Sequence, residues 1–389
     1  MTDDRTRRWR LLLGPDAGKL GDLSDDDAKR DAALTALYGG DGGGIGSSGG
    51  GKRSGGLGSS SPKLHRWLGD VRTYFPTSVV QIMQRDAVER LGLTKLLLEP
   101  ELLSSVEPDV HLVGTLVSLS RAIPQRTRET ARAVVRKVVE EIERKLADRL
   151  IAAVNGAVDR SRRTRRPRMS DVDWPTTIRS NLKHYQPDQR TLVVETLIGA
   201  HRRSRRAALR DVILLVDQSG SMAESVVYSA VFGATLASLQ AVQTRLVVFD
   251  TEVVDLTETL DDPVDLLFST QLGGGTDINR AVAYAQQHIS RPADTVLVLI
   301  SDLYEGGVAA ELQRRVRELV ASGVTVVVLL ALSDSGTPAY DHELAARLSA
   351  LGAPSFACTP DAFPDLLAVA LRREDVGAWA EQEGMAVGR

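Results

Sequence analysis

The sequence predicts an α/β protein whose main domain is a Rossmann-like, doubly wound, mostly parallel sheet preceded by a mainly helical N-terminal region. Two observations support this prediction. Between residues 211 and 332, four short runs rich in Val and Leu alternate with helical stretches, and strands buried on both faces of a parallel sheet are nearly continuously apolar in this way. Between residues 62 and 155, apolar residues recur at spacings of three and four, which is typical of amphipathic helices.

The elements of the sheet domain follow from the apolar runs and the segments between them. We predict strands at 211–217, 245–250, 295–302 and 325–332, and helices at 222–243, 278–290, 308–322, 341–351 and 361–373. In a doubly wound sheet, ligands bind at the carboxyl ends of the strands. We therefore expect the functional site at that edge.

Changes in composition divide the 389 residues into six parts. We assign an N-terminal segment to 1–38, a Gly/Ser-rich flexible linker to 39–61, a helical domain to 62–158, an Arg-rich connector to 159–210, the α/β domain to 211–373 and a C-terminal tail to 374–389. The clearest helix is 124–150, which has an apolar stripe opposite a charged face. We interpret the stripe as packing within the helical domain, with docking to a partner as the alternative.

Charge and cysteine content exclude several classes of protein. The chain has 48 Lys and Arg against 51 Asp and Glu, a formal net charge of -3, so its overall charge does not indicate binding to nucleic acid or to an anionic membrane. No apolar stretch approaches the ~20 residues that cross a bilayer, and the N-terminus does not resemble a signal peptide, so we expect a cytoplasmic protein. Cys358 is the one cysteine; it excludes an intramolecular disulfide, and we expect it to be a small buried apolar residue.

The Gly-rich tract contains a partial phosphate-loop pattern in Gly46, Gly51 and Lys52. Arg53 stands where Mg·ATP chemistry needs Ser or Thr, and no strand precedes the tract. We interpret the pattern as a chance match.

Two clusters of arginine flank the segment 173–197, which we interpret as a bridging segment with a strand in its final part. The clusters are Arg160, Arg162, Arg163, Arg165, Arg166 and Arg168, followed by Arg202, Arg203, Arg205 and Arg206. No aromatic residues interleave with them, so we favour a solvated or salt-bridged connector, then docking to an acidic protein, and last nucleic-acid binding.

Three polar loops fall where the predicted fold places a site. Asp217, Ser219 and Ser221 form a D-x-S-x-S pattern at the end of the first predicted strand, Thr276 lies in a Gly-rich loop, and Asp302 ends a later strand. Mg²⁺ prefers hard oxygen ligands and retains several waters. We expect the two serine hydroxyls to bind Mg²⁺ or Mn²⁺ directly, Thr276 to bind directly or through water, and the two carboxylates to hold coordinated water. The alternative is that these residues are only helix caps and turn residues.

With these five residues, the sequence resembles the von Willebrand factor A (VWA) domain family with its metal-ion-dependent adhesion site, over about 211–373. The longer context resembles bacterial CoxE-like VWA proteins. This resemblance implies a non-enzymatic protein whose metal ion binds an acidic residue of a partner. It also implies association with a MoxR-type AAA+ ATPase or its client, in an assembly or remodelling system.

Three competing functions are weighed against this one. Asp217 could be the nucleophile of a Mg²⁺-dependent phosphohydrolase, but Ser219 stands where such enzymes need a second carboxylate as acid and base. Serine hydrolase chemistry is disfavoured because the serines lack a nucleophile-elbow pattern. Nucleic-acid binding through the arginine clusters stays open and would be strongly salt-dependent.

Overall fold

The structure is a computed structural model that divides into two compact units, Met1–Val138 and Val139–Arg389. It describes residues 9–10, 23–38, 61–91, 97–120, 122–161, 163–164, 167, 169, 172–200, 210–270, 274–334 and 339–388. The phosphate-loop-like pattern at 46–53 and the side chains of both arginine clusters lie outside the described residues. Among the described helices, none combines the length and the apolarity that a membrane crossing requires.

The first unit is helical, as predicted. Its helices are α2 (Asp25–Tyr38), α3 (Ser61–Tyr74), α4 (Thr77–Leu91), α5 (Pro100–Ser104), α6 (Val110–Ser118) and the first part of α7 (Gln125–Ser161). A core between α2, α3 and α4 includes Leu37, Trp67 and Met83, all buried. The Trp67 indole donates to the carbonyl of Ala33 at 3.0 Å, which satisfies its N–H inside this core.

Helix α7 extends eleven residues beyond the predicted end at 150. Val154 and Ala157 are fully buried and continue the apolar stripe at spacings of four and three after Leu150. The same apolar face therefore packs along the longer helix and stabilises it, and the prediction ended the helix too early.

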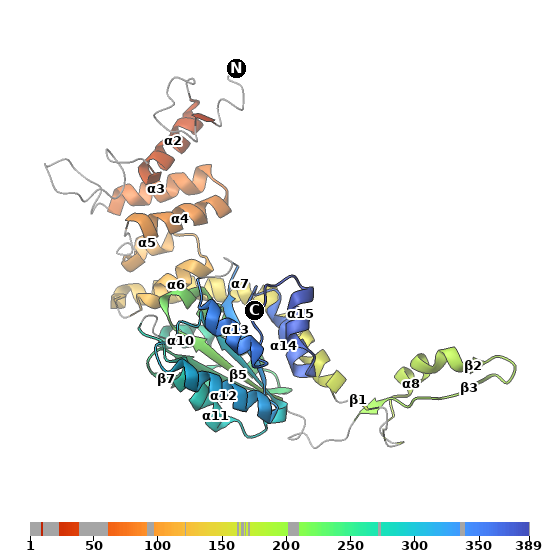
Figure 1. Cartoon of the computed structure of the whole chain (residues 1–389). Helices are drawn as coiled ribbons and strands as arrows, with labels where there is room; N and C mark the ends of the chain where they lie inside the picture. The colour runs from red at the N-terminus through yellow and green to blue at the C-terminus, as the bar shows by residue number, and fades with distance from the viewer. Residues whose placement is uncertain are drawn as a thin grey trace. The chain divides into compact units, whose positions relative to one another are not determined.

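The second unit contains a six-stranded sheet with the order β10-β9-β8-β5-β6-β7 (Figure 1). Its strands are β5 (Arg210–Asp217), β6 (Val242–Phe249), β7 (Val253–Asp255), β8 (Thr295–Ile300), β9 (Thr325–Leu332) and β10 (Ser355–Cys358). All neighbours pair in parallel except β6 and β7. The chain adds β6 on one side of β5 and β8, β9 and β10 on the other, so the topological switch point lies beside β5. The predicted doubly wound, mostly parallel sheet is confirmed.

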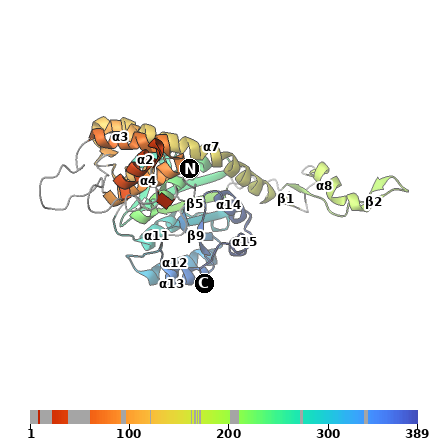
Figure 2. The ribbon, with the colours of Figure 1, turned by 90° about the horizontal axis from the view of Figure 1, so that it is seen from above.

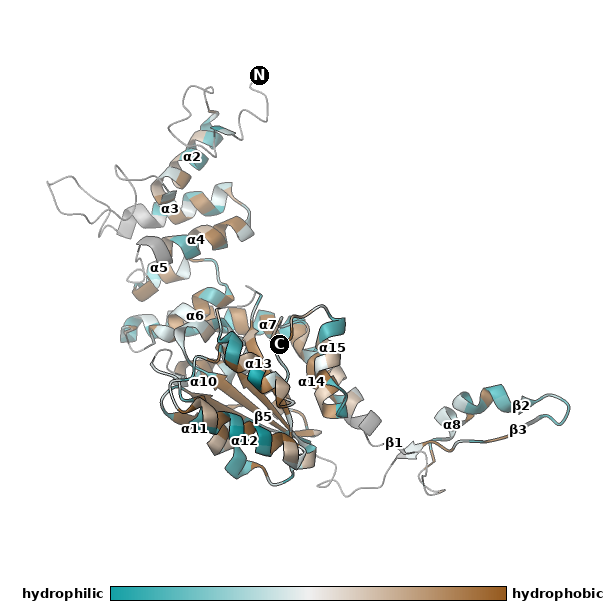
Figure 3. Ribbon diagram, viewed as in Figure 1, coloured by the Kyte–Doolittle hydropathy of each residue, from teal (hydrophilic) through white to brown (hydrophobic). Residues whose placement is uncertain are grey.

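Helices cover both faces of this sheet (Figures 1 and 2). They are α9 (Ala223–Ala237), α10 (Pro263–Ser269), α11 (Ile278–His288), α12 (Ala309–Ser322), α13 (His342–Ala350), α14 (Phe363–Arg372) and α15 (Val376–Gln382). On one face, α11, α12 and α13 share a core with alternate residues of the strands, including Leu215 and Phe249. On the other, α9 packs on β5 and β6, and Phe232 stacks on Phe363 of α14 with ring centroids 4.6 Å apart. Figure 3 shows the apolar strands between helices with hydrophilic outer surfaces.

Several predicted boundaries were wrong. The predicted helix 222–243 ends at Ala237, and β6 begins at Val242, three residues before the predicted strand. Parallel pairing of Val242 with Arg210 and the alternating burial along β6 override the helical pattern. Strand β8 ends at Ile300 rather than 302. The short elements β7, β10, α10 and α15 were not predicted, because they have too few residues to show a period.

We call residues 172–200 the α8 segment. Its strands are much shorter than the strand predicted there. The segment contains α8 (Trp174–Asn181), a 3₁₀ turn η4 (Leu182–His184), β2 (Tyr185–Gln186), β3 (Thr191–Leu192) and β4 (Gly199–Ala200), which pairs with β1 (Arg163–Thr164). The predicted strand at the end of 173–197 is reduced to the two residues of β3.

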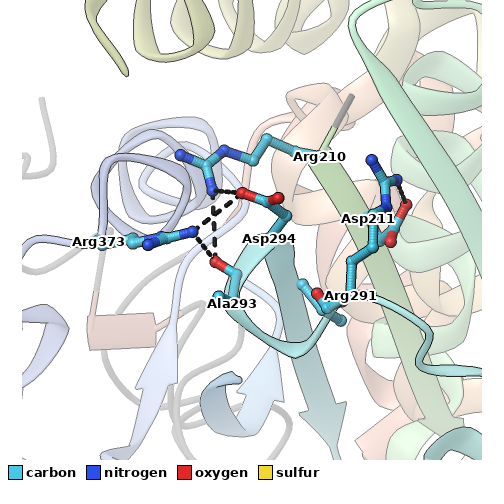
Figure 4. Close-up of polar contacts among 7 residues, drawn as sticks. Arg210, Asp211, Arg291, Ala293, Asp294 and Arg373 are labelled. Carbon is cyan, nitrogen blue, oxygen red and sulfur yellow. Dashed lines mark hydrogen bonds and ion pairs between the residues drawn. The ribbon is translucent and has the colours of Figure 1, made fainter. Parts of the chain in front are cut away.

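An ion-pair network closes the amino-terminal edge of the sheet (Figure 4). Asp294 accepts from the guanidinium groups of Arg210, at 2.6 Å, and Arg373, at 2.9 Å. Arg291 pairs with Asp211 beside it. The network therefore joins the start of β5 to the turn before β8 and to the end of α14. Cys358, in β10, is buried as predicted, and burial raises the pKa of its thiol to about 12.

Candidate metal centre

Asp217 is the last residue of β5 and is fully buried at the carboxyl edge of the sheet. Its Oδ1 accepts from the backbone N–H of Ser219 at 2.8 Å, and its Oδ2 accepts from the hydroxyl of Ser301 at 2.7 Å. Both oxygens are therefore held in place by the loop that follows β5 and by the end of β8. The switch point of the sheet positions this carboxylate, as the fold rule predicts.

The two serines of the D-x-S-x-S loop connect Asp217 to Asp302. The hydroxyl oxygens of Ser219 and Ser221 are 3.2 Å apart, and Ser221 donates to Oδ2 of Asp302 at 2.6 Å. Ser221 is exposed, whereas Asp302 is buried. Four of the five predicted residues thus form one series of hydrogen bonds, which passes from the buried Asp217 through the exposed Ser221 to the buried Asp302.

Thr276 lies in a neighbouring loop. Its carbonyl accepts from the backbone N–H of Gly306 at 2.7 Å, and the next residue, Asp277, donates its N–H to the carbonyl of Asp250 at 2.8 Å. Because Asp250 follows β6 and Gly306 follows β8, the Thr276 loop lies across the same carboxyl edge. Within the described residues, no hydrogen bond joins the Thr276 side chain to the other four side chains.

Three residues that support this arrangement were not assigned a role by sequence reasoning. Glu305 accepts from the N–H of Ile278 at 2.8 Å and Asp277 from that of Arg280 at 2.8 Å, so the two carboxylates together cap α11 directly after Thr276. A Cβ at Gly306 would lie 2.7 Å from the Thr276 carbonyl oxygen, so the close approach requires glycine. In the sequence, the run Glu-Gly-Gly at 305–307, shortly after β8, was the feature that could have indicated these roles.

Ser301 is the other residue that was missed. It was noted only as the neighbour of Asp302, yet it is fully buried, donates to Asp217 and accepts from the N–H of Leu303 at 3.0 Å. Leu303 itself is buried with a positive φ of 66°, an uncommon conformation for a branched side chain. The backbone turn after β8 is thus held in a strained form beside the site.

Helix α9, which follows the serine loop, is anchored to the end of β9. Ser225 accepts from the N–H of Leu332 at 3.0 Å, and the hydroxyl of Tyr228 donates to Asp334 at 2.7 Å. Burial, followed by the hydrogen bond to the Asp334 carboxylate, raises the pKa of Tyr228 well above its ordinary value. The phenol stays protonated and keeps donating. The two bonds therefore hold the first turns of α9, which follow Ser221, against the end of β9.

Two acids, Asp217 and Asp302, dominate the electrostatics of this edge. Burial raises the pKa of Asp217, and the negative charge of Asp302 raises it further, while hydrogen bonds from Ser219 and Ser301 oppose the shift. No Lys or Arg in the described part of the chain pairs with either carboxylate. Two buried acids without a basic partner are costly unless a cation or a proton compensates them.

The donor chemistry fits Mg²⁺ or Mn²⁺. The side chains offer only hydroxyl and carboxylate oxygens, which hard divalent cations prefer. No group of three or more His, Cys, Asp or Glu side chains able to hold a metal occurs among the residues that the structure describes. A metal at this edge would therefore depend on the serine and threonine hydroxyls as well as on the acids.

The sheet order and the polar loops at its switch point define an α/β domain of the VWA class. The family of VWA domain containing CoxE-like proteins matches residues 146–367, more than half of the chain. Uncharacterized protein YehP of Escherichia coli (strain K12) is 39% identical over 369 residues, covering 95% of this chain and 97% of that protein. The chain belongs to this CoxE-like VWA family, and VWA domains of this kind support a general role in protein interaction.

Two solved structures are similar to parts of the chain at low identity. An aerotolerance-related membrane protein from Bacteroides fragilis NCTC 9343 has a TM-score of 0.32 and 14% identity, over 43% of this chain and 99% of that one. The conserved hypothetical protein BatB from Bacteroides thetaiotaomicron has a TM-score of 0.33 and 14% identity, over 42% and 98%. The family assignment depends on the family match and on YehP, not on these structures.

Proposed function

We propose that this protein is a non-enzymatic interaction protein that binds an acidic residue of a partner through a divalent metal at the carboxyl edge of its sheet. The observation that supports this most is the hydrogen-bonded series of Asp217, Ser219, Ser221 and Asp302, with two acids that lack a basic partner in the described residues. The residues proposed to hold the metal are Asp217, Ser219, Ser221, Thr276 and Asp302.

Each side chain has a distinct role in the proposed site. The hydroxyls of Ser219 and Ser221 are neutral direct ligands, and Thr276 contributes directly or through water. Asp217 and Asp302 orient the serines and hold coordinated water. Because the direct ligands are neutral, bound Mg²⁺ or Mn²⁺ retains most of its charge and supplies a coordination position for a carboxylate oxygen of another protein.

The partner we propose is a MoxR-type AAA+ ATPase or a client delivered to it, with this protein as the adaptor. This proposal follows from the resemblance to CoxE-like VWA proteins. The exposed Ser221 and the neighbouring exposed side chain of Tyr304 leave the site accessible to such a partner. Partner and metal then strengthen each other's binding by the same factor, because the two equilibria are linked.

Titration calorimetry with MgCl₂ and MnCl₂ tests the metal site. Asp217→Ala and Ser219→Ala should each abolish or greatly weaken binding, because they remove an anchor and a ligand of the same series. Ser322→Ala is the control: its hydroxyl donates to a helix carbonyl at the end of α12, away from the site. Metal binding by Asp217→Ala that equals that of the parent protein would refute the proposal.

A second experiment tests the partner and the absence of catalysis. A purified MoxR-type ATPase from the same organism should bind the full chain in Mg²⁺, and the complex should weaken with EDTA or with Ser219→Ala but not with Ser322→Ala. Purified protein should release no phosphate from generic phosphoesters or ATP. Phosphate release that disappears in Asp217→Asn would instead identify the phosphohydrolase alternative.

A further inference from the structure

Exposed apolar side chains are concentrated in the α8 segment. Six of the thirteen large apolar side chains that are exposed in the described part of the chain lie within its 29 residues. They are Trp174, Ile178, Leu182, Tyr185, Val193 and Val194. A scattered exposed apolar residue needs no explanation, but a concentration of this kind marks an interaction site.

Three of these residues form a stripe on one side of α8 and η4. Trp174, Ile178 and Leu182 are spaced by four residues and are 45%, 45% and 57% exposed. Residues at this spacing lie one above another on a helix. Thr177 and Asn181, also four apart, are instead buried at 0% and 2%. The helix therefore buries its polar side and exposes its apolar side, the reverse of the ordinary pattern of a surface helix.

The segment holds its shape through the buried polar side chains. The hydroxyl of Thr177 donates to the carbonyl of Ile198 at 3.0 Å. The Asn181 side chain donates to the carbonyl of Thr196 at 2.8 Å and accepts from the N–H groups of Glu195 and Thr196 at 3.0 and 3.2 Å. Since these bonds join the helix to the returning chain, the apolar stripe is not needed to form the local structure.

Two basic residues directly follow residues of the stripe in the sequence. Arg179 follows Ile178 and Lys183 follows Leu182, and neither makes an ion pair with another described residue. Over residues 160–206 the sequence has thirteen Lys and Arg against four Asp and Glu. An apolar stripe in a basic segment is complementary to an apolar groove with an acidic rim.

We propose that the α8 segment is a second docking surface, on which Trp174, Ile178 and Leu182 enter an apolar groove bordered by acidic residues on a partner protein. Asp173 directly precedes Trp174, and the side chain of Glu195 is 66% exposed. Both acids have local partners, since Asp173 accepts from the N–H of Thr176 and Glu195 lies 2.7 Å from the His184 imidazole, so they do not oppose an acidic rim. A polyphosphate is disfavoured because it offers no apolar surface to the stripe. The surface shares no residue with the metal centre and does not depend on metal.

The test places a photoreactive p-benzoylphenylalanine at position 178 in the full chain, expressed in the cells that produce the protein. The matched control carries it at Ile82, which is 57% exposed on α4. Position 178 should cross-link to a partner-protein peptide from an apolar, Asp- and Glu-bordered groove, and position 82 should not. That partner is then purified, and its affinity for the full chain is measured by fluorescence anisotropy.

With the purified partner, Leu182→Glu should weaken binding by about tenfold or more, because a buried apolar contact is replaced by a charge facing an acidic rim. Ile82→Glu and EDTA should leave the affinity unchanged, which separates this surface from the metal centre. Ile178→Ser provides a second variant should Leu182→Glu lower the melting temperature. Cross-links to this chain itself, to lipid or to nucleic acid, or none above the level at position 82, would overturn the proposal.

Discussion

The hydroxyl of Ser301 donates to Oδ2 of Asp217 at 2.7 Å, joining two strand ends that are 84 residues apart in the sequence. The contact follows from the parallel register, in which Val216 pairs with Ile300, so that the next residue of each strand reaches the same edge. Asp217 is thereby held from β8 as well as from its own loop. The orientation of this carboxylate therefore depends on Ser301, which is not one of the five residues proposed to hold the metal.

Ser301→Ala should therefore weaken Mn²⁺ binding while leaving the protein folded. Losing a hydrogen bond to a buried carboxylate should also lower the free energy of unfolding by about 1.5–3 kcal/mol. Ser355→Ala is the matched control, since Ser355 is equally buried and donates to the carbonyl of Ala353 away from the site. Calorimetry and urea unfolding on both variants check this. Equal metal affinity in the two variants would contradict a positioning role for Ser301.

Gly306→Ala should displace the loop that carries Thr276. Its new Cβ would lie 2.7 Å from a backbone carbonyl oxygen that cannot rotate away, and we expect a loss of roughly 1–3 kcal/mol in the free energy of unfolding together with weaker metal binding. In Gly156→Ala, by contrast, a Cβ on helix α7 meets nothing within 4 Å. That control should gain about 0.5–1 kcal/mol from helix propensity. Unchanged metal binding in Gly306→Ala would show that the loop position is irrelevant to the site.

Asp294→Ala should destabilise the second unit without affecting metal binding. The change removes the shared partner of Arg210 and Arg373 at the amino-terminal edge (Figure 4), and Arg210 is largely buried there. A loss of about 1–3 kcal/mol is expected. The exposed pair of Glu343 with Arg347 provides the control, since Glu343→Ala should cost no more than about 0.5 kcal/mol. Urea unfolding measures both, and a change in Mn²⁺ affinity in Asp294→Ala would contradict the independence of the two edges.

Asp255→Asn should reduce stability in a pH-dependent manner. Burial alone would raise the pKa of Asp255, but hydrogen bonds from Thr257 and Tyr284 and the charge of Arg245 lower it below the ordinary value. A lowered pKa in the folded state contributes stability above the unfolded-state pKa, near 3.8, and this contribution is lost as the pH falls through the folded value.

The difference in unfolding free energy between Asp255→Asn and the parent protein should therefore be about 1–2 kcal/mol at pH 7 and should shrink below pH 4. Urea unfolding between pH 7 and pH 3 measures it. A difference that stays constant or grows as the solution becomes more acidic would show that the carboxylate is not stabilised by its charge.

Part of the candidate site could be predicted because Asp217 and Asp302 are carboxylates placed at the ends of apolar runs. Asp217 ends β5 and Asp302 lies two residues beyond β8, and parallel strands bring their carboxyl ends to one edge. Ser301 and Gly306 could not be assigned in this way. Their roles depend on one contact each, to Asp217 and to the Thr276 carbonyl, and both contacts join segments that the sequence places far apart.

The same distinction holds for the elements of the fold. Helix α12 was predicted nearly to the residue because its apolar face repeats with helical period over fourteen residues. Residues 238–243 were predicted as helix, but pairing with β5 makes part of them the start of β6. Local pattern cannot report a partner strand, since the energy of the ladder comes from residues elsewhere in the chain.

The sequence by itself determined the class of fold, the helical character of the first unit and the edge of the sheet at which Asp217, Ser219, Ser221 and Asp302 lie at or just after the ends of two strands. These depend on the period of the apolar residues along the chain and on where each apolar run ends, which are properties of neighbouring residues. Only the tertiary structure decided which buried groups hold those side chains and which helix face is left exposed. Trp174 and Ile178 occupy positions that an ordinary amphipathic helix would bury, and they are exposed because Thr177 and Asn181 find their hydrogen-bond partners in the returning chain.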